Sequence, residues 1–127
     1  MRFKLFEGSP ETVEADFNEW QRLHKPYMVM GTEIVRSGED IAIMSRWSEP
    51  DPSKAWARTF LHFIEGLPHE VEIAINAWLQ TLPTDMGALV RVDRIEAPEG
   101  MLRYLCTMQK VEQPKIIAAR NGDQIVH

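Results

Sequence analysis

An internal repeat with an offset of 58 residues is the feature that most constrains this chain. Residues 5–20 read LFEGSPETVEADFNEW, residues 63–78 read FIEGLPHEVEIAINAW, and seven of the sixteen positions are identical without a gap. The offset is longer than the period of common solenoid repeats, so a duplicated half-domain is the better interpretation. The identical pairs are Glu7/Glu65, Gly8/Gly66, Pro10/Pro68, Val13/Val71, Glu14/Glu72, Asn18/Asn76 and Trp20/Trp78.

Each copy predicts a strand followed by an amphipathic helix. Apolar and polar residues alternate over residues 2–7 and 59–65, which is typical of strands. Pro10 and Pro68 then suit the first position of a helix, where the missing N–H breaks no hydrogen bond. Apolar residues at helical spacing follow on one face: Val13, Phe17 and Trp20 in the first copy, and Val71, Ile75 and Trp78 in the second.

Two more strands are predicted after each helix. In the first copy, the turn residues 37–40 join strands over residues 29–36 and 41–47. In the second copy, the turn residues 97–100 join two corresponding apolar stretches, residues 89–96 and 101–108. The half-unit is therefore β-α-β-β, present twice.

Two such units predict an α+β fold, because one unit has a sheet face to cover and too small a core to be stable alone. We expect a pseudo-twofold two-layer sandwich with a mostly antiparallel shared sheet and both helices on one face. The chain is then a single domain, residues 1–127. It divides into repeat one (1–47), a linker (48–58), repeat two (59–112) and a C-terminal tail (113–127).

The third strand of each repeat is apolar on both faces, which predicts a cover for the second face of the sheet. The tail contains Asn121-Gly122, a strong hairpin signal, flanked by extended stretches. Such a hairpin is not stable alone. We therefore expect it to dock on the sheet or on a neighbouring chain, and a frayed terminus is the alternative.

Charge excludes several kinds of partner. Fourteen Lys and Arg against nineteen Asp and Glu give a net charge of −5, and the basic residues form no cluster. Phosphate neutralisation by clustered cations dominates non-specific nucleic-acid binding, so nucleic acid is not expected as a partner. The same argument excludes a polybasic membrane-surface patch.

Apolar runs and cysteine usage suggest a compartment. The longest apolar runs hold four residues, too few for a membrane-spanning helix. The single cysteine, Cys106, cannot form an internal disulfide, so the fold does not depend on an oxidising compartment. We expect a cytoplasmic protein.

The segment Lys4-Leu5-Phe6, followed by Val13-Glu14, Asn18 and Trp20, resembles small βαββ proteins associated with bacterial sporulation. The resemblance covers about 45 residues of the first copy and, more loosely, the second. It implies the βαββ fold of that family. It implies no activity, because that family has none to transfer.

Paired polar residues on the two helices are the first candidate site. Glu14 and Asn18, and equally Glu72 and Asn76, lie one helical turn apart beside the apolar face. They are candidates to line a ligand cleft between the helices. The favoured alternative is a structural contact at the edge of the core, or an Asn bonded to backbone.

Aromatic residues that break the repeat form the second candidate site. Trp47 and Trp56 bracket the linker and have no counterpart in the other copy. Together with Arg46 and Arg58 they are candidates for a surface that binds a partner or stacks on a ligand. The alternative, which we favour, is that they hold the linker against the sheet.

No pattern of high specificity points to catalysis. His62 or His69 with Glu65 or Glu70 is the best available acid–base pair, but no metal-binding or nucleophile motif accompanies it. Cys106 lies in an apolar strand and is expected to be a small buried hydrophobe. We therefore assign no catalytic residue, no metal ligand and no cofactor.

Together these features favour a non-catalytic binding or assembly module that forms homo-oligomers. A small-ligand-binding protein with a cleft at the seam between the repeats is the second hypothesis. A small enzyme that uses a His/Glu pair is the third. The expected partners are a copy of the chain, another protein or a small ligand.

Overall fold

The computed structural model describes residues 1–23, 28–49, 51 and 53–112. The C-terminal tail, with the hairpin expected around Asn121-Gly122, lies outside the described residues.

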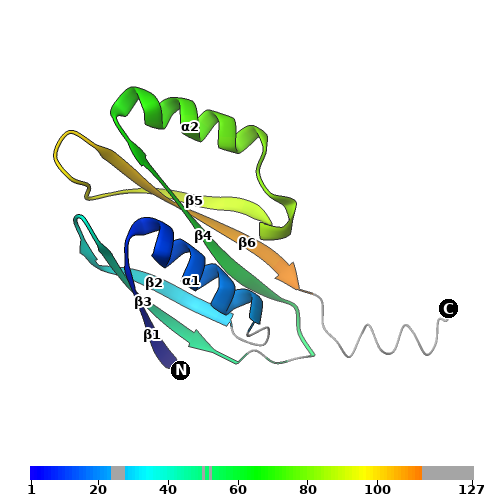
Figure 1. Cartoon of the computed structure of the whole chain (residues 1–127). Helices are drawn as coiled ribbons and strands as arrows, with labels where there is room; N and C mark the ends of the chain where they lie inside the picture. The colour runs from blue at the N-terminus through cyan, green and yellow to red at the C-terminus, as the bar shows by residue number, and fades with distance from the viewer. Residues whose placement is uncertain (24–27, 50, 52, 113–127) are drawn as a thin grey trace.

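The described chain has the element order expected from the repeat. The first copy contains β1 (Arg2–Gly8), α1 (Pro10–Leu23), β2 (Met28–Ser37) and β3 (Ile41–Ser48). The second contains β4 (Trp56–Gly66), α2 (Pro68–Gln80), a short 3-10 helix η1 (Thr84–Met86), β5 (Ala88–Ile95) and β6 (Leu102–Glu112). The fold is therefore α+β with a β-α-β-β layout in each half (Figure 1).

The strands form two antiparallel three-stranded sheets, in the orders β1-β3-β2 and β4-β6-β5. The expectation of one shared sheet was wrong. No strand of one repeat pairs with a strand of the other among the described residues, and side chains of α1 bond the free edge of β4. Each sheet has its first strand at one edge and its third in the centre.

Strand β4 begins earlier than the repeat predicts. Trp56, Ala57 and Arg58, expected in the linker, pair with the end of β6 as far as Glu112. The two longest strands thus form a ribbon that extends past the body of the sheet (Figure 1).

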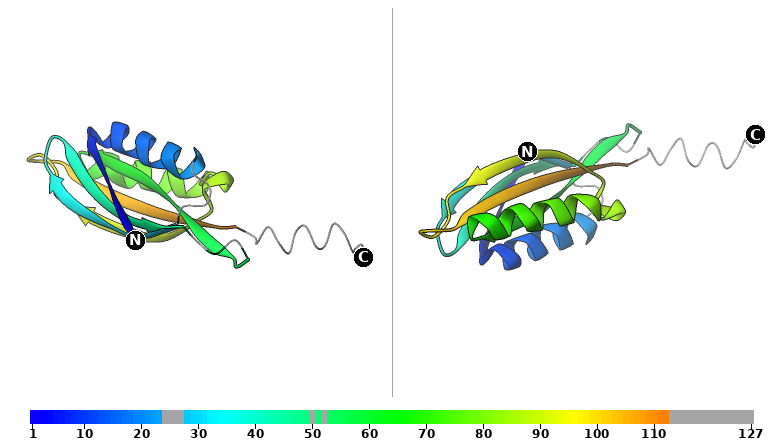
Figure 2. Two further views of the ribbon diagram at one scale, coloured as in Figure 1. Left: turned by 90° about the horizontal axis from the view of Figure 1, so that it is seen from below. Right: turned by 90° about the horizontal axis from the view of Figure 1, so that it is seen from above.

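Both helices lie on the same side of the molecule (Figure 2). Helix α1 packs against β1 and β3 of its own repeat and also against β4, whereas α2 packs against β4 and β6. Ser9 accepts a hydrogen bond from the Thr12 N–H at the start of α1. At the start of α2, where Leu67 offers no such oxygen, Glu70 accepts one from the Leu67 N–H.

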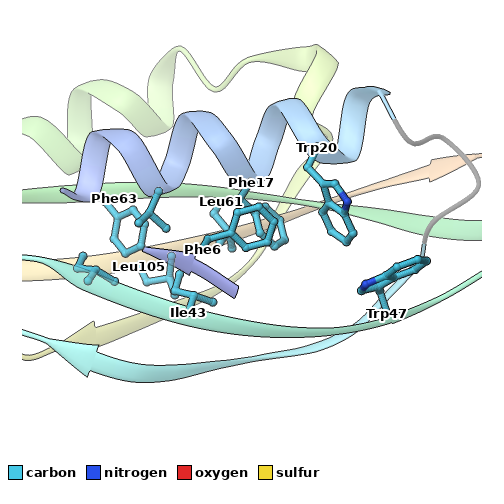
Figure 3. Packing of buried hydrophobic residues seen from close by; sticks show 10 residues of the cluster. Phe6, Phe17, Trp20, Ile43, Trp47, Leu61, Phe63 and Leu105 are labelled. Atoms are coloured by element: carbon cyan, nitrogen blue, oxygen red, sulfur yellow. The ribbon is translucent and has the colours of Figure 1, made fainter. Parts of the chain in front are cut away.

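The larger hydrophobic cluster lies beneath α1 and combines residues of both repeats (Figure 3). Phe6, Phe17 and Trp20 make edge-to-face ring contacts with centroids 5.2–5.8 Å apart. Leu61 and Phe63 of β4 complete this cluster from the second repeat. The first repeat therefore depends on the second for its core.

A smaller cluster lies beneath α2 and contains only residues of the second repeat. Phe60, Val71, Cys106 and Met108 are among its buried members. Trp78 of α2 packs on it from a half-buried position. No strand from the first repeat contributes a buried residue to it within the described chain.

A buried arginine ties the hairpin turns of the two repeats together. Arg103 is almost completely buried, and its Nε donates to Glu65 at 2.7 Å. Its Nη1 donates to the Gly38 carbonyl at 2.7 Å and to the Glu96 carbonyl at 3.1 Å. Because an unpaired buried charge is costly, this set of partners holds the turn after β2 against the turn after β5.

Candidate functional site

Three polar residues of α1 bond the free edge of β4. Glu14, Asn18 and Gln21 lie beside the apolar face of the helix, and we call them the polar ladder. The Phe63 N–H donates to Glu14 Oε1 at 2.7 Å. The Thr59 N–H donates to Gln21 Oε1 at 2.9 Å.

Asn18 bonds both backbone groups of one β4 residue, as a residue of a neighbouring strand would. The Leu61 N–H donates to Asn18 Oδ1 at 2.8 Å, and Asn18 Nδ2 donates to the Leu61 carbonyl at 2.8 Å. Asn18 is buried, so both backbone groups of Leu61 would lack a partner without it.

The spacing of the ladder follows from helix and strand geometry. Four helix residues rise about 6 Å, and two strand residues rise about 6.6 Å. Residues at i, i+4 and i+7 of α1 can therefore meet alternate residues of an antiparallel strand. The ladder closes the edge of β4, which would otherwise be open to pairing with another chain.

Glu14 of the polar ladder also contacts His62. Its Nδ1 lies 2.9 Å from Glu14 Oε2, and its ring stacks on Trp78 with centroids 4.6 Å apart. Both Glu14 oxygens are therefore occupied by contacts to β4. This pairing differs from the His/Glu pairs expected from the sequence, although His62 and Glu65 both line a small groove of about 290 Å³ between the helices.

The equivalents of Glu14 and Asn18 in α2 have no such strand. Glu72 and Asn76 are exposed and hydrogen-bond to no described residue. The third ladder position is Leu79, which is exposed where Gln21 is buried. Thus the two symmetric Glu/Asn pairs do not line one cleft: one pair holds β4, and the other faces solvent.

Strand β1, the equivalent of β4 in the first repeat, has an open edge. It is one of the two edge strands of its sheet, and among the described residues it pairs only with β3. Phe3 and Leu5 are 62% and 46% exposed, whereas their equivalents Leu61 and Phe63 are 0% and 8% exposed. An open strand edge with apolar side chains is a characteristic surface for association with another chain.

The aromatic candidates do not gather into one surface. Trp47 is buried in the larger cluster and contacts Trp20 edge to face, with centroids 5.8 Å apart. Trp56 is half-buried at the start of β4. The two tryptophans that bracket the linker therefore have different surroundings.

The two arginine candidates also separate. Arg58 is buried and donates to the Gln21 carbonyl and, at 3.0 Å, to Glu112 Oε1. It thereby joins the end of α1 to the β4–β6 ribbon. Arg46 is exposed and lies over Gly31 on the neighbouring strand.

A cleft of about 640 Å³ lies at the seam between the two sheets. It runs between strands β2 and β3 of the first repeat and β5 and β6 of the second. Its polar lining residues are Thr32, Arg46, Thr59, Arg91, Asp93, Thr107 and Gln109. Of the aromatic and arginine candidates, only Arg46 borders it.

Other chemistry has little support among the described residues. They include no group of three or more His, Cys, Asp and Glu that could hold a metal ion. Burial and, to a smaller extent, the Glu14 carboxylate raise the pKa of the Cys106 thiol to about 11, so the reactive thiolate is scarce at neutral pH. In the part of the chain that the structure describes, no helix is long and apolar enough to cross a membrane.

Gln21 and Arg103 were missed by sequence reasoning. Gln21 was detectable from its i, i+7 spacing to Glu14, but its second-repeat equivalent is Leu79 and comparison of the copies hid it. Arg103 offered no signal, because its partners are Glu65 and groups of two turns that only the folded chain brings beside it.

Comparison of the chain with protein-family models, curated proteins and solved structures gives no match.

Proposed function

We propose that this chain is a non-catalytic binding or assembly module that associates with copies of itself. The observation that carries the proposal is the exposed apolar edge of β1. Phe3 and Leu5 are large and exposed there, although the equivalent residues of β4 are buried. Removing apolar surface from water is favourable by about 25 cal/mol per Å², so association that covers this edge is favoured.

The resemblance to βαββ sporulation-associated proteins and the pseudo-twofold relation of the repeats stay predictions within this proposal. The proposal also keeps a cytoplasmic location, because the fold uses no disulfide and its one cysteine is buried.

The molar mass in solution tests self-association. Light scattering of the full chain should give a mass above 14.7 kDa that rises with concentration. Leu5→Glu should return the mass to that of the monomer, and Val111→Glu, which changes an exposed residue far along β6, should not. A monomer at millimolar concentration would refute the proposal, and a lower mass after deletion of residues 115–127 would add the tail to the interface.

Binding of a small polar ligand in the seam cleft is a second candidate function. The cleft combines Arg46, Arg91 and Asp93 with apolar walls, the usual mixture of a ligand site. A screen of small anionic metabolites should then raise the melting temperature, and Arg46→Ala should abolish the shift. No shift with any compound would remove this candidate.

A further inference from the structure

The contact that joins the two repeats uses two surfaces, and the chain carries each surface twice. One surface is a helix with Glu and Asn one turn apart. The other is the edge of the strand that begins a repeat. Among the described residues, α1 and β4 are joined, while the helix α2 of repeat two and the strand β1 of repeat one are left open.

We propose that α2 of one copy binds the edge of β1 of a second copy, in the way that α1 binds β4. This inference rests on the proposed self-association and gives its geometry. The offset of 58 residues fixes the contacts: the Glu72 carboxylate accepts from the Leu5 N–H, and Asn76 bonds both backbone groups of Phe3.

The apolar residues of α2 and β1 correspond to those that pack together where α1 meets β4. Leu61 and Phe63 fill the cluster around Phe17. Their equivalents, Phe3 and Leu5, are exposed, and Ile75, the equivalent of Phe17, is only half-buried. Docking of β1 would bury all three.

Charge supports the same pairing. Helix α2 carries Glu70 and Glu72 and neither Lys nor Arg. Strand β1 carries Arg2 and Lys4 near the proposed contact. Opposite charges steer the two surfaces together and disfavour a β1–β1 contact.

The interface is heterologous, because each copy contributes a different surface to it. Such contacts generate a ring when the rotation closes and a filament when it does not. An unclosed assembly leaves one helix surface open at one end and one strand edge open at the other. An isologous dimer would have no open ends, so the two modes are separable by blocking one surface at a time.

The experiment mixes two variants that each lack one surface. Leu5→Glu blocks the strand, and the double variant Glu72→Lys with Asn76→Arg blocks the helix. Each alone should be a monomer of 14.7 kDa, and an equimolar mixture should form a heterodimer of twice that mass by sedimentation velocity. Circular dichroism melting confirms that each variant is folded.

Ile73→Lys is the matched control. Ile73 is exposed on the same helix, and its equivalent, Ala15, is exposed in α1 although α1 holds β4. It should assemble as the unmodified chain does. Loss of assembly in this control would show non-specific hydrophobic association and overturn the inference.

The outcomes separate this inference from the proposed function. A full chain that stays monomeric refutes self-association itself. A full chain that assembles, with a helix-blocked variant that still assembles alone or a mixture that forms no heterodimer, overturns only the head-to-tail geometry.

Hydrogen exchange on the unmodified chain gives a second test that needs no variant. The amides of Phe3 and Leu5 should gain protection of about tenfold or more as concentration rises. Unchanged exchange of these amides in an assembled sample would overturn the inference.

Discussion

Helices α1 and α2 derive from the same repeated sequence and have different environments. In α1 the apolar face is buried and Asn18 and Gln21 are buried with it, whereas in α2 only Val71 is buried. Residues that are identical in the two helices are thus buried in α1 and exposed in α2 at the Asn18 and Asn76 positions. A strand of the other repeat lies beside α1, and no strand of the described chain lies in the corresponding place beside α2.

This difference shows that recurrence in a repeat does not mean equal roles. Glu14 and Asn18 are structural because β4 is present, and Glu72 and Asn76 have the same chemistry with no hydrogen-bond partner among the described residues. The measurements that follow test this contrast, from the largest expected effect to the smallest, with equivalent positions as controls for each other.

Truncation of the central aromatic of α1 should have the largest effect. Phe17→Ala should lower the free energy of unfolding by about 3–5 kcal/mol, because Phe17 is fully buried between the repeats. Ile75→Ala, at the equivalent half-buried position of α2, should cost about 1 kcal/mol. Urea denaturation of dilute samples measures both, and equal losses would contradict the contrast between the helices.

Removal of the ladder asparagine should come next. Asn18→Ala leaves the buried N–H and C=O of Leu61 without partners and should lower the free energy of unfolding by about 2–3 kcal/mol. Asn76→Ala in the monomer should change it by less than about 0.5 kcal/mol, since Asn76 is exposed. A similar loss for both variants at low concentration would show that α2 has a partner within the chain.

Alkaline pH should lower the free energy of unfolding through Cys106, which is buried in the second repeat. Its pKa is raised from 9.0 to about 11 in the folded chain, so the unfolded chain loses the proton first as pH rises above 9. This group should leave the free energy of unfolding nearly unchanged below about pH 8 and lower it by about 1.4 kcal/mol at pH 10.

Cys106→Ser isolates this effect, because Ser45 already occupies the equivalent buried place in the first repeat. The variant should lack the part of the alkaline decrease that Cys106 causes. Parallel stability curves for the two proteins between pH 8 and pH 10 would disprove the assignment.

The smallest effect belongs to the exposed face of α2. Leu79→Gln, which restores the residue of the first repeat, should change the free energy of unfolding by less than about 0.5 kcal/mol, since Leu79 is exposed. A thermal melt measures it. A loss above 1 kcal/mol would mean that this position is packed in solution.

Much of the fold was predictable because the signals are local. Alternation, proline at the first helical position and helical spacing of Val13, Phe17 and Trp20 located β1 and α1 to within a few residues. Comparison of the copies then extended the same order to the second half. The early start of β4 was not predictable, because residues 56–58 gain strand structure only from pairing with β6.

Some residues of the candidate site were predictable from the sequence, but the roles of these residues were not. Glu14 and Asn18 were singled out from their recurrence, but their partners are backbone groups more than 40 residues away. Trp47 broke the repeat and suggested a surface site, yet it is buried against Trp20. Side-chain type and spacing give no information on which strand arrives beside a helix.

The sequence by itself determined the two β-α-β-β units and the polar and apolar faces of their helices, because these depend on periods of two and 3.6 residues within short segments. Only the tertiary structure decided that the units form two sheets instead of one. It also decided that α1 holds the edge of β4 while α2 and β1 stay open. That choice depends on long-range packing, in which Leu61 and Phe63 of one repeat complete the core of the other.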